Sequence, residues 1–356
     1  MSRLRVLACA VLVASAAVAA HAQAPAPTPS PLASPVAAAA PEASPDPVPT
    51  LVQAARLRIA QGQAASALEM LRDAPASDPR VRLAIGVAHY HAGAPALALE
   101  PLQAALASLP ADSAESREAV QVLGLSYYLA GRLPEAIPLL ERTRTFAPDS
   151  SELAYVLGMA YIQTRQPDRA RETWARAYRV SPDSAAARLL TAQMMVRAEM
   201  EEMAQAELTA ALEKDPRLPH AHLLLGQAAL FRGRLEEALA LFAKELEVNP
   251  GSAMAFYRLG DAYTRQLQWD RALDALQRSV WLNPYFSGPY ILMGKAYQGK
   301  GDRAAAEGML RRAIGYDPNN KAAHYLLAQV LQQLGRADEA KKEFEVAERL
   351  QGTNER

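Results

Sequence analysis

The chain has 356 residues, of which 50% are hydrophobic, and it carries 38 basic and 38 acidic residues. That hydrophobic fraction is enough for a sizeable buried core, which excludes a chain that is disordered throughout. The balanced charge gives no electrostatic reason to expect a nucleic-acid partner or an anionic membrane surface. We therefore expect a folded protein that does not bind nucleic acid.

Residues 1–22 are typical of a secretory signal peptide. Arg3 and Arg5 supply its positive start, and the apolar segment 6–20 that follows is too short to span a membrane. Ala20 and Ala22 then form an A-x-A cleavage site. We expect cleavage after Ala22 and a periplasmic or secreted chain without an integral membrane span.

The only cysteine of the chain, Cys9, lies inside this signal. The residues VLAC resemble a bacterial lipobox, but only three apolar residues precede Cys9, so we do not expect a lipid anchor there. After cleavage the chain would have no cysteine. A disulfide, a thiolate catalyst and a cysteine metal site are then excluded.

Residues 23–49 are rich in proline and alanine and contain almost no large apolar side chain. Proline fixes φ and removes amide donors, so this segment favours an extended, solvated backbone. We interpret it as a disordered linker that acts as a semi-rigid spacer. A docking site for a proline-recognising domain is the alternative, although no basic residue flanks the prolines to orient such a ligand.

Residues 50–350 form a repeat array, and from Pro148 to Pro318 its prolines recur every 34 residues, whereas the spacing from Gly86 to Gly124 is 38 residues. After Pro148, five further prolines each follow 34 residues after the last, and such a series would arise by chance with a probability on the order of one in a million. The residues before them are mostly small turn formers, so each proline should follow the end of a helix and mark a turn into the next. These prolines are Pro148, Pro182, Pro216, Pro250, Pro284 and Pro318.

Between the prolines the apolar residues predict two helices separated by a short polar turn. Leu157, Gly158 and Tyr161 share one face of a first helix, and Ala170 and Trp174 share one face of a second helix. Glycine inside a helix costs about 0.8–1 kcal/mol relative to alanine, which a close approach of the two helices would explain. The glycines of the first helices are Gly86, Gly124, Gly158, Gly226, Gly260 and Gly294.

The run L-G-x-x-Y, then A-x-x-x-F/W/L-x-x-A, then P, resembles the tetratricopeptide repeat (TPR). The resemblance covers about residues 48–350 and implies an all-α fold, a right-handed superhelical α-solenoid of antiparallel helix pairs with about nine repeats. Residues 351–356 remain as a C-terminal tail. The resemblance implies no particular activity, because the family binds many unrelated partners.

The last helix of the array has no following helix to cover it. Its charged residues, which include Lys341, Lys342, Glu345 and Glu348, would allow it to act as its own polar cap. Self-association through the C-terminal repeat is the alternative.

No constellation in the sequence predicts catalysis, a metal site or a cofactor. The pairs His89 and His91, and His220 and His222, are two residues apart, which places the rings on different faces of a helix. A phosphate-binding loop and a G-x-S-x-G nucleophile elbow are both missing from the sequence. We therefore expect a protein that is not an enzyme.

In the resembling family a concave groove is lined by first-helix residues that face away from the second helix. By register, the positions three before and one after the small residue would line it here, and Tyr128, Phe231 and Gln332 lie one turn further on. Tyrosines would anchor an extended or helical peptide and amides would satisfy its backbone, while packing between repeats is the alternative for single tyrosines. The candidate residues are Gln121, Leu125, Tyr128, Tyr155, Met159, Leu223, Gln227, Phe231, Tyr257, Asp261, Ile291, Lys295, Tyr325, Gln329 and Gln332.

The sequence thus predicts an exported, non-enzymatic scaffold or adaptor that binds protein segments in its groove. Assembly of a bacterial envelope, secretion, pilus or polysaccharide-export complex fits the resemblance best. The alternative is a carbohydrate-binding accessory subunit whose groove aromatics stack on sugar rings.

Overall fold

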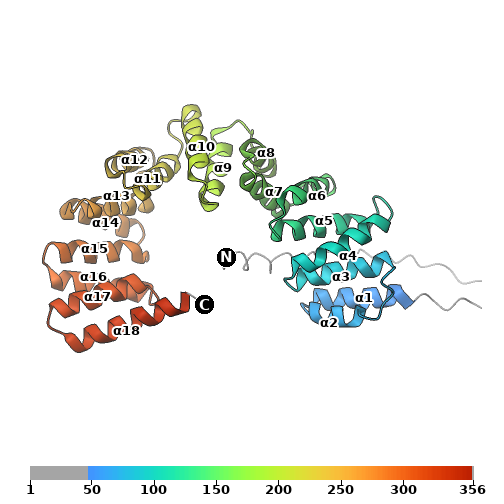
Figure 1. Cartoon of the computed structure of the whole chain (residues 1–356). Helices are drawn as coiled ribbons and strands as arrows, with labels where there is room; N and C mark the ends of the chain where they lie inside the picture. The colour runs from blue at the N-terminus through green and yellow to red at the C-terminus, as the bar shows by residue number, and fades with distance from the viewer. Residues whose placement is uncertain (1–46, 355–356) are drawn as a thin grey trace, which may run out of the picture. The chain divides into compact units, whose positions relative to one another are not determined.

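The computed structural model describes residues 47–354, which form eighteen α-helices and no strand. The helices follow one another in pairs, and eight of these pairs pack as hairpins (Figure 1). The predicted all-α repeat solenoid is therefore confirmed. None of the helices in this part of the chain has the length and apolar character needed to cross a membrane. The predicted signal peptide, Cys9 and most of the predicted linker lie outside the described residues.

The chain divides into two compact units, residues 1–173 and residues 174–356, with the boundary inside α8 (Pro167–Ala177). The first unit contains α1 (Pro47–Ala60), α2 (Ala64–Leu71), α3 (Pro79–His91), α4 (Pro95–Ser108), α5 (Ala114–Leu129), α6 (Leu133–Phe146) and α7 (Ser151–Gln163). The second unit contains α9 (Ala185–Arg197), α10 (Glu201–Lys214), α11 (Ala221–Phe231), α12 (Leu235–Val248), α13 (Ala253–Arg265), α14 (Trp269–Leu282), α15 (Ser287–Gly299), α16 (Arg303–Tyr316), α17 (Lys321–Gln333) and α18 (Ala337–Asn354). The pairs that pack as hairpins are α1–α2, α3–α4, α5–α6, α9–α10, α11–α12, α13–α14, α15–α16 and α17–α18.

Each unit has two layers of helices. In the second unit α11 contacts α13, α13 contacts α15 and α15 contacts α17, and each also packs against the second helices before and after it. The first unit repeats this arrangement in α1, α3, α5 and α7. The first helices of the pairs therefore form one layer, and the second helices form the other (Figure 1).

The repeat prolines lie in the turns between pairs, as predicted. Pro250, for example, lies between α12 and α13. Two residues later Ser252 caps α13, because its Oγ accepts a hydrogen bond from the backbone N–H of Ala255 at 3.2 Å. Asn320 caps α17 in the same way through the N–H of Ala323. The 34-residue spacing thus places a helix-breaking proline and a capping residue just before most first helices.

The helix ends extend beyond the predicted boundaries of the repeat array. α1 begins at Pro47, within the predicted linker, and α18 continues to Asn354, within the predicted tail. Proline is tolerated in the first turn of a helix, because its missing N–H would have no partner there. Val48 is only 6% exposed, so this turn is held by burial of an apolar side chain.

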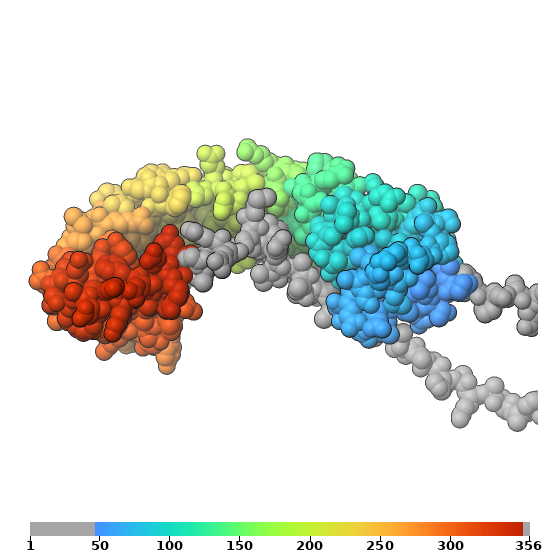
Figure 2. Space-filling view, turned by 60° about the horizontal axis from the view of Figure 1, so that its bottom comes forward, coloured from blue at the N-terminus to red at the C-terminus, as the bar shows by residue number. Residues whose placement is uncertain are grey.

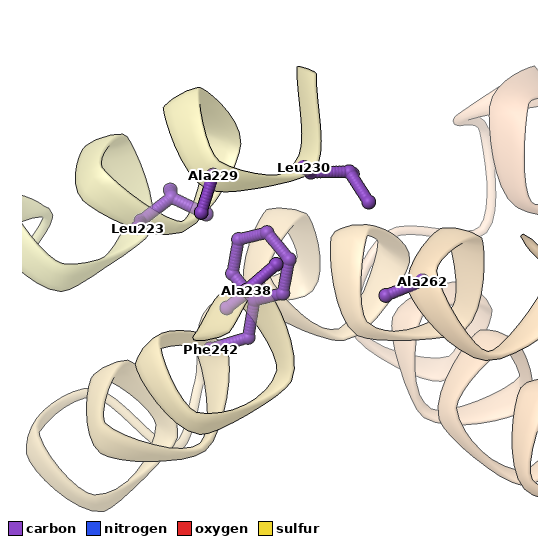
Figure 3. Close-up of a cluster of buried hydrophobic side chains, with 7 residues drawn as sticks. Leu223, Ala229, Leu230, Ala238, Phe242 and Ala262 are labelled. Atoms are coloured by element: carbon purple, nitrogen blue, oxygen red, sulfur yellow. The ribbon is translucent and has the colours of Figure 1, made fainter. Parts of the chain in front are cut away.

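The glycines inside first helices mark close contacts between paired helices, as predicted. A β-carbon built on Gly226 would lie 2.5 Å from Cε1 of Phe242, whose side chain is fully buried in α12. Figure 3 shows the Phe242 ring beneath α11, beside Ala238. At Gly260 and Gly294 the corresponding contacts are with Leu276 at 2.5 Å and Leu310 at 2.6 Å. A large side chain of the second helix thus fills the space that each glycine leaves.

Replacing Gly226 with alanine should lower the free energy of unfolding. Overpacking a close-packed core costs about 1–3 kcal/mol, which exceeds the roughly 0.8–1 kcal/mol gained in helix propensity. Gly308 provides the matched control, because it lies within α16 and a β-carbon there would meet nothing within 4 Å. Gly308→Ala should therefore stabilise the chain. Urea unfolding followed by circular dichroism would measure both changes, and a stabilising Gly226→Ala would contradict the packing explanation.

Candidate functional site

The predicted groove residues all lie on first helices, but they differ in exposure. Met159 and Leu223 are only 7% and 6% exposed, so these two side chains belong to the packed interior and offer almost no surface to a partner. Phe231, Lys295, Tyr325 and Gln332 are exposed. The remaining predicted residues are half-buried, namely Gln121, Leu125, Tyr128, Tyr155, Gln227, Tyr257, Asp261, Ile291 and Gln329.

In the first unit two of the predicted tyrosines come together. Burial raises the pKa of Tyr128 on α5, and the nearby phenol of Tyr155 on α7 raises this pKa further. A hydrogen bond with the side chain of Gln163, at the end of α7, acts in the opposite direction. The three side chains thus form one polar aromatic cluster across two neighbouring first helices. Gln163 was not among the predicted residues.

In the second unit the Tyr257 ring is held by two side chains. Its ring lies 4.8 Å from the ring of Phe286 in an edge-to-face arrangement, and the Arg258 guanidinium lies 5.1 Å from its centroid. Both contacts fix an aromatic ring more firmly than burial alone would. Burial raises the pKa of the Tyr257 phenol, and the charges of Arg258 and Arg265 oppose that shift. Tyr257 is therefore a rigid, neutral aromatic side chain.

Arg265 connects α13, the helix of Tyr257, with the neighbouring first helix α11. Arg265 pairs with Asp261 on the same helix, with Nε and Oδ1 3.0 Å apart. One of its NH groups also donates to the backbone carbonyl of Leu230, near the end of α11, at 3.4 Å. The next residue, Phe231, is 79% exposed. We refer to Phe231, Tyr257, Asp261 and Arg265 as the Tyr257 face.

Phe286 and Arg265 were not predicted, although a comparison of register positions between repeats could have identified both. Phe286 stands two residues after Pro284, where Ser252 and Asn320 cap their helices in neighbouring repeats. An aromatic residue in place of a capping residue signals a different role for that position. Arg265 occupies the same register position as Phe231, 34 residues later, and the prediction used that position in one repeat only.

The helix that carries Phe231 has an unusual cap. α11 begins after His220, which has a φ of 70° and makes no capping hydrogen bond through its side chain. The carboxylate of Glu245 on α12 takes over this role, because it accepts from the N–H of His220 at 2.9 Å and from the N–H of Leu223 at 3.3 Å. Glu245 is completely buried. Its charge thus satisfies the free N–H groups of a helix N-terminus.

The last repeat ends in an open, partly charged surface. Tyr325 packs edge-to-face on Phe344 at 5.6 Å, and a hollow of about 300 Å³ lies beside Phe344 and Gln332. Glu348, which lines this hollow, stands where the two preceding repeats carry Val280 and Ile314. Both of those apolar residues pack against the repeat that follows them. The charge on α18 accords with the predicted polar cap.

One histidine, His324, is a packing residue. His324 is 7% exposed, and its ring nitrogens lie 2.6 Å from a carboxylate oxygen of Glu343 and 2.9 Å from the carbonyl oxygen of Pro318. Burial lowers the pKa of His89 and of His91. Between residues 47 and 354 no group of three or more His, Cys, Asp or Glu side chains is arranged to hold a metal ion.

Two family models, both described as tetratricopeptide repeat, match this chain. One matches residues 127–194 and 297–355, and the other matches residues 52–114, 202–253 and 227–285. Together the matched segments span well over half of the chain. The chain belongs to the tetratricopeptide-repeat family. Proteins of this family are in general non-catalytic scaffolds for protein interactions that use the extended surfaces of their solenoids.

Several solved structures are similar to parts of this chain. The MamA segment from residue 41 to the end, from Desulfovibrio magneticus RS-1, is 24% identical with a TM-score of 0.44, and the match covers 48% of this chain and 97% of that solved segment. YrrB, described as a TPR protein with an unusual peptide-binding site, is 22% identical with a TM-score of 0.43, over 51% of this chain and 94% of YrrB. A chain of the Cut9–Hcn1 hetero-tetramer is 17% identical with a TM-score of 0.44, and the match covers 77% of this chain and 55% of that chain. No curated protein matches this TPR chain.

Replacing Glu245 with alanine, the residue at this register in several other repeats, should destabilise this TPR protein. The change leaves the buried N–H of Leu223 and the partly buried N–H of His220 without this partner, which costs about 1–3 kcal/mol. Glu247→Ala is the control, because Glu247 is exposed on the same helix and should change the stability by less than about 0.5 kcal/mol. Thermal unfolding would compare the two variants, and equal effects would show that Glu245 is not needed as a cap.

Proposed function

We propose that this TPR protein is a non-enzymatic scaffold that binds a segment of a partner protein at the Tyr257 face. The observation that carries the proposal is the exposure of Phe231, which is 79% accessible at the end of a first helix. The same register position carries Gln163, Arg197 and Gln333 in other repeats. The fold therefore does not require an aromatic side chain there, whereas a partner would gain from covering it.

The chemistry of the Tyr257 face suits a polypeptide. Phe231 and Tyr257 offer apolar area with little side-chain entropy to lose, which is typical of interface anchors. Asp261 and Arg265 offer an acceptor and donors beside the aromatic rings, so they can bind the backbone of an extended segment. Asp261 and Arg265 are also already paired, which reduces the cost of ordering them on binding.

We further propose that the chain is exported and that its partner belongs to a bacterial envelope, secretion, pilus or polysaccharide-export complex. The basic start, apolar stretch and A-x-A site of residues 1–22 support export. The absence of cysteine after Ala22 is compatible with an oxidising compartment, because no thiol would be exposed to mispairing.

Placing the photo-reactive residue benzoylphenylalanine at position 231 should crosslink this chain to one protein partner in living cells. Phe231→Gln, which copies the residue at position 163, should weaken binding of the purified partner by about tenfold or more, as expected for an interface anchor. Leu267→Asn is the matched control, because Leu267 is 65% exposed in the turn between α13 and α14. A glycan ligand in place of a protein, or equal losses in both variants, would contradict the proposal.

Export can be tested by the mass of the chain recovered from a bacterial host. We expect a periplasmic product that begins at Gln23, and retention of the full-length chain in the cytoplasm after Arg3→Glu and Arg5→Glu. Intact-mass spectrometry of the two cell fractions would measure this. An uncleaved cytoplasmic product from the unchanged sequence would overturn the export proposal without affecting the Tyr257 face.

A further inference from the structure

Apart from the Tyr257 face, the described part of the second unit exposes five large aromatic side chains. Tyr178 and Tyr325 are two of them, and the other three lie at or just beyond the ends of α14 and α16. Trp281 is 82% exposed near the end of α14, Tyr285 is 77% exposed in the turn that follows, and Tyr316 is 44% exposed at the end of α16. These helices belong to the orange and red part of Figure 2. We refer to the three residues as the aromatic ledge.

Two of the three ledge rings, those of Tyr285 and Tyr316, are connected to a buried ring, so they are not simply loose surface groups. The rings of Tyr285 and Tyr316 lie 5.8 Å apart at 89°, and the rings of Tyr316 and Tyr290 lie 5.4 Å apart at 36°. Tyr290 is 4% exposed, and its hydroxyl donates to the carbonyl of Pro284 at 3.0 Å. Tyr316 is thus held between a buried ring and an exposed one.

The repeat fold does not require aromatic residues at the ledge. The register position of Trp281 carries Glu247 in the preceding repeat and Gly315 in the following one. The position of Tyr285 carries Gly251 and Asn319. Neighbouring repeats therefore form the same turn with small or polar residues. Large exposed apolar side chains beyond what the fold needs are typical of a surface that another segment covers.

A positive side chain lies beside the ledge. Arg312 lies four residues before Tyr316, on the same face of α16, and its side chain is exposed. Burial raises the pKa of Tyr290, and the charge of Arg312 opposes that shift, which places the guanidinium near these rings. The nearby carboxylate of Asp317 is engaged within its own turn, because Oδ2 accepts from Asn320 at 3.0 Å.

One segment of this chain has the complementary chemistry. Residues 23–46 contain seven prolines, the acids Glu42 and Asp46, and no lysine or arginine. Chains with this density of proline favour the extended polyproline II conformation, which docks on exposed aromatic rings with little loss of entropy. Acidic residues among the prolines match Arg312 beside the ledge.

We propose that the aromatic ledge binds the proline-rich segment 23–46 of a second copy of this chain. Each copy carries one ledge and one segment, so two copies can exchange segments about a two-fold axis and make the contact twice. Two linked contacts bind much more tightly than one, which offsets the weakness of a single proline–aromatic contact. The proposal does not depend on the proposed function of the Tyr257 face.

Isotope-mixed crosslinking of the full chain tests the proposal directly. Chains with benzoylphenylalanine in place of Tyr285 are prepared in normal and in heavy-nitrogen medium, mixed, irradiated and digested. We expect crosslinks from position 285 to peptides of residues 23–46 that combine one light and one heavy partner. Crosslinks to residues 23–46 that never combine the two labels would show that the ledge binds the segment of its own chain. Crosslinks to other regions, or no crosslinks, would show that the ledge does not bind this segment. Each of these outcomes overturns the proposal.

Sedimentation of the full chain provides a second measurement with variants that copy neighbouring repeats. Trp281→Glu and Tyr285→Asn introduce the residues found at positions 247 and 319, so they should leave the fold intact. Together they should weaken self-association by at least about tenfold, as expected for the loss of aromatic anchors. Phe231→Gln is the control and should leave self-association unchanged. Self-association that persists in the double variant, or that is missing from the unchanged chain, would overturn the proposal.

Discussion

The fold depends on one contact that recurs along the chain, in which a large side chain of a second helix occupies the space above a glycine of its partner. At Gly226 this side chain is Phe242, and at Gly260 and Gly294 it is a leucine. The glycine lowers the helix propensity, but it brings the two helices close enough for the large residue to be fully buried. Because the contact lies within 16 residues of chain, each pair can form its core locally.

Most of the fold could be predicted from this periodicity. The six prolines placed the turns between pairs, and the glycines placed the contacts within them. The ends of the array were not predicted, because the start of α1 is held by burial of Val48 rather than by any residue of the repeat pattern. Periodicity identifies interior repeats, since each has neighbours on both sides. Terminal helices are defined by how much apolar surface they bury, which the pattern does not report.

The candidate site was predicted less well than the fold, for a physical reason. Register states which way a residue points, but not how deeply its neighbours bury it. Leu223 and Met159 occupy groove positions by register and are nevertheless buried. Conversely, Gln163, Arg265 and Phe286 act through contacts with residues of adjacent repeats, and those contacts depend on the distance between helices. The repeats themselves supply the useful comparison, because a residue that differs from its counterparts at the same position is one that the common fold does not explain.

The Glu245 cap has a consequence for how the array opens. In the two neighbouring repeats the first helices α9 and α13 each carry a capping serine in their own turn, so each keeps that cap if its second helix detaches. α11 instead borrows its cap from α12 through Glu245. Detachment of α12 therefore also uncovers the N-terminus of α11 and leaves two N–H groups unpaired. These two helices therefore form one cooperative unit, and their amide protons should lose protection from hydrogen exchange together. The neighbouring helices can instead fray one at a time.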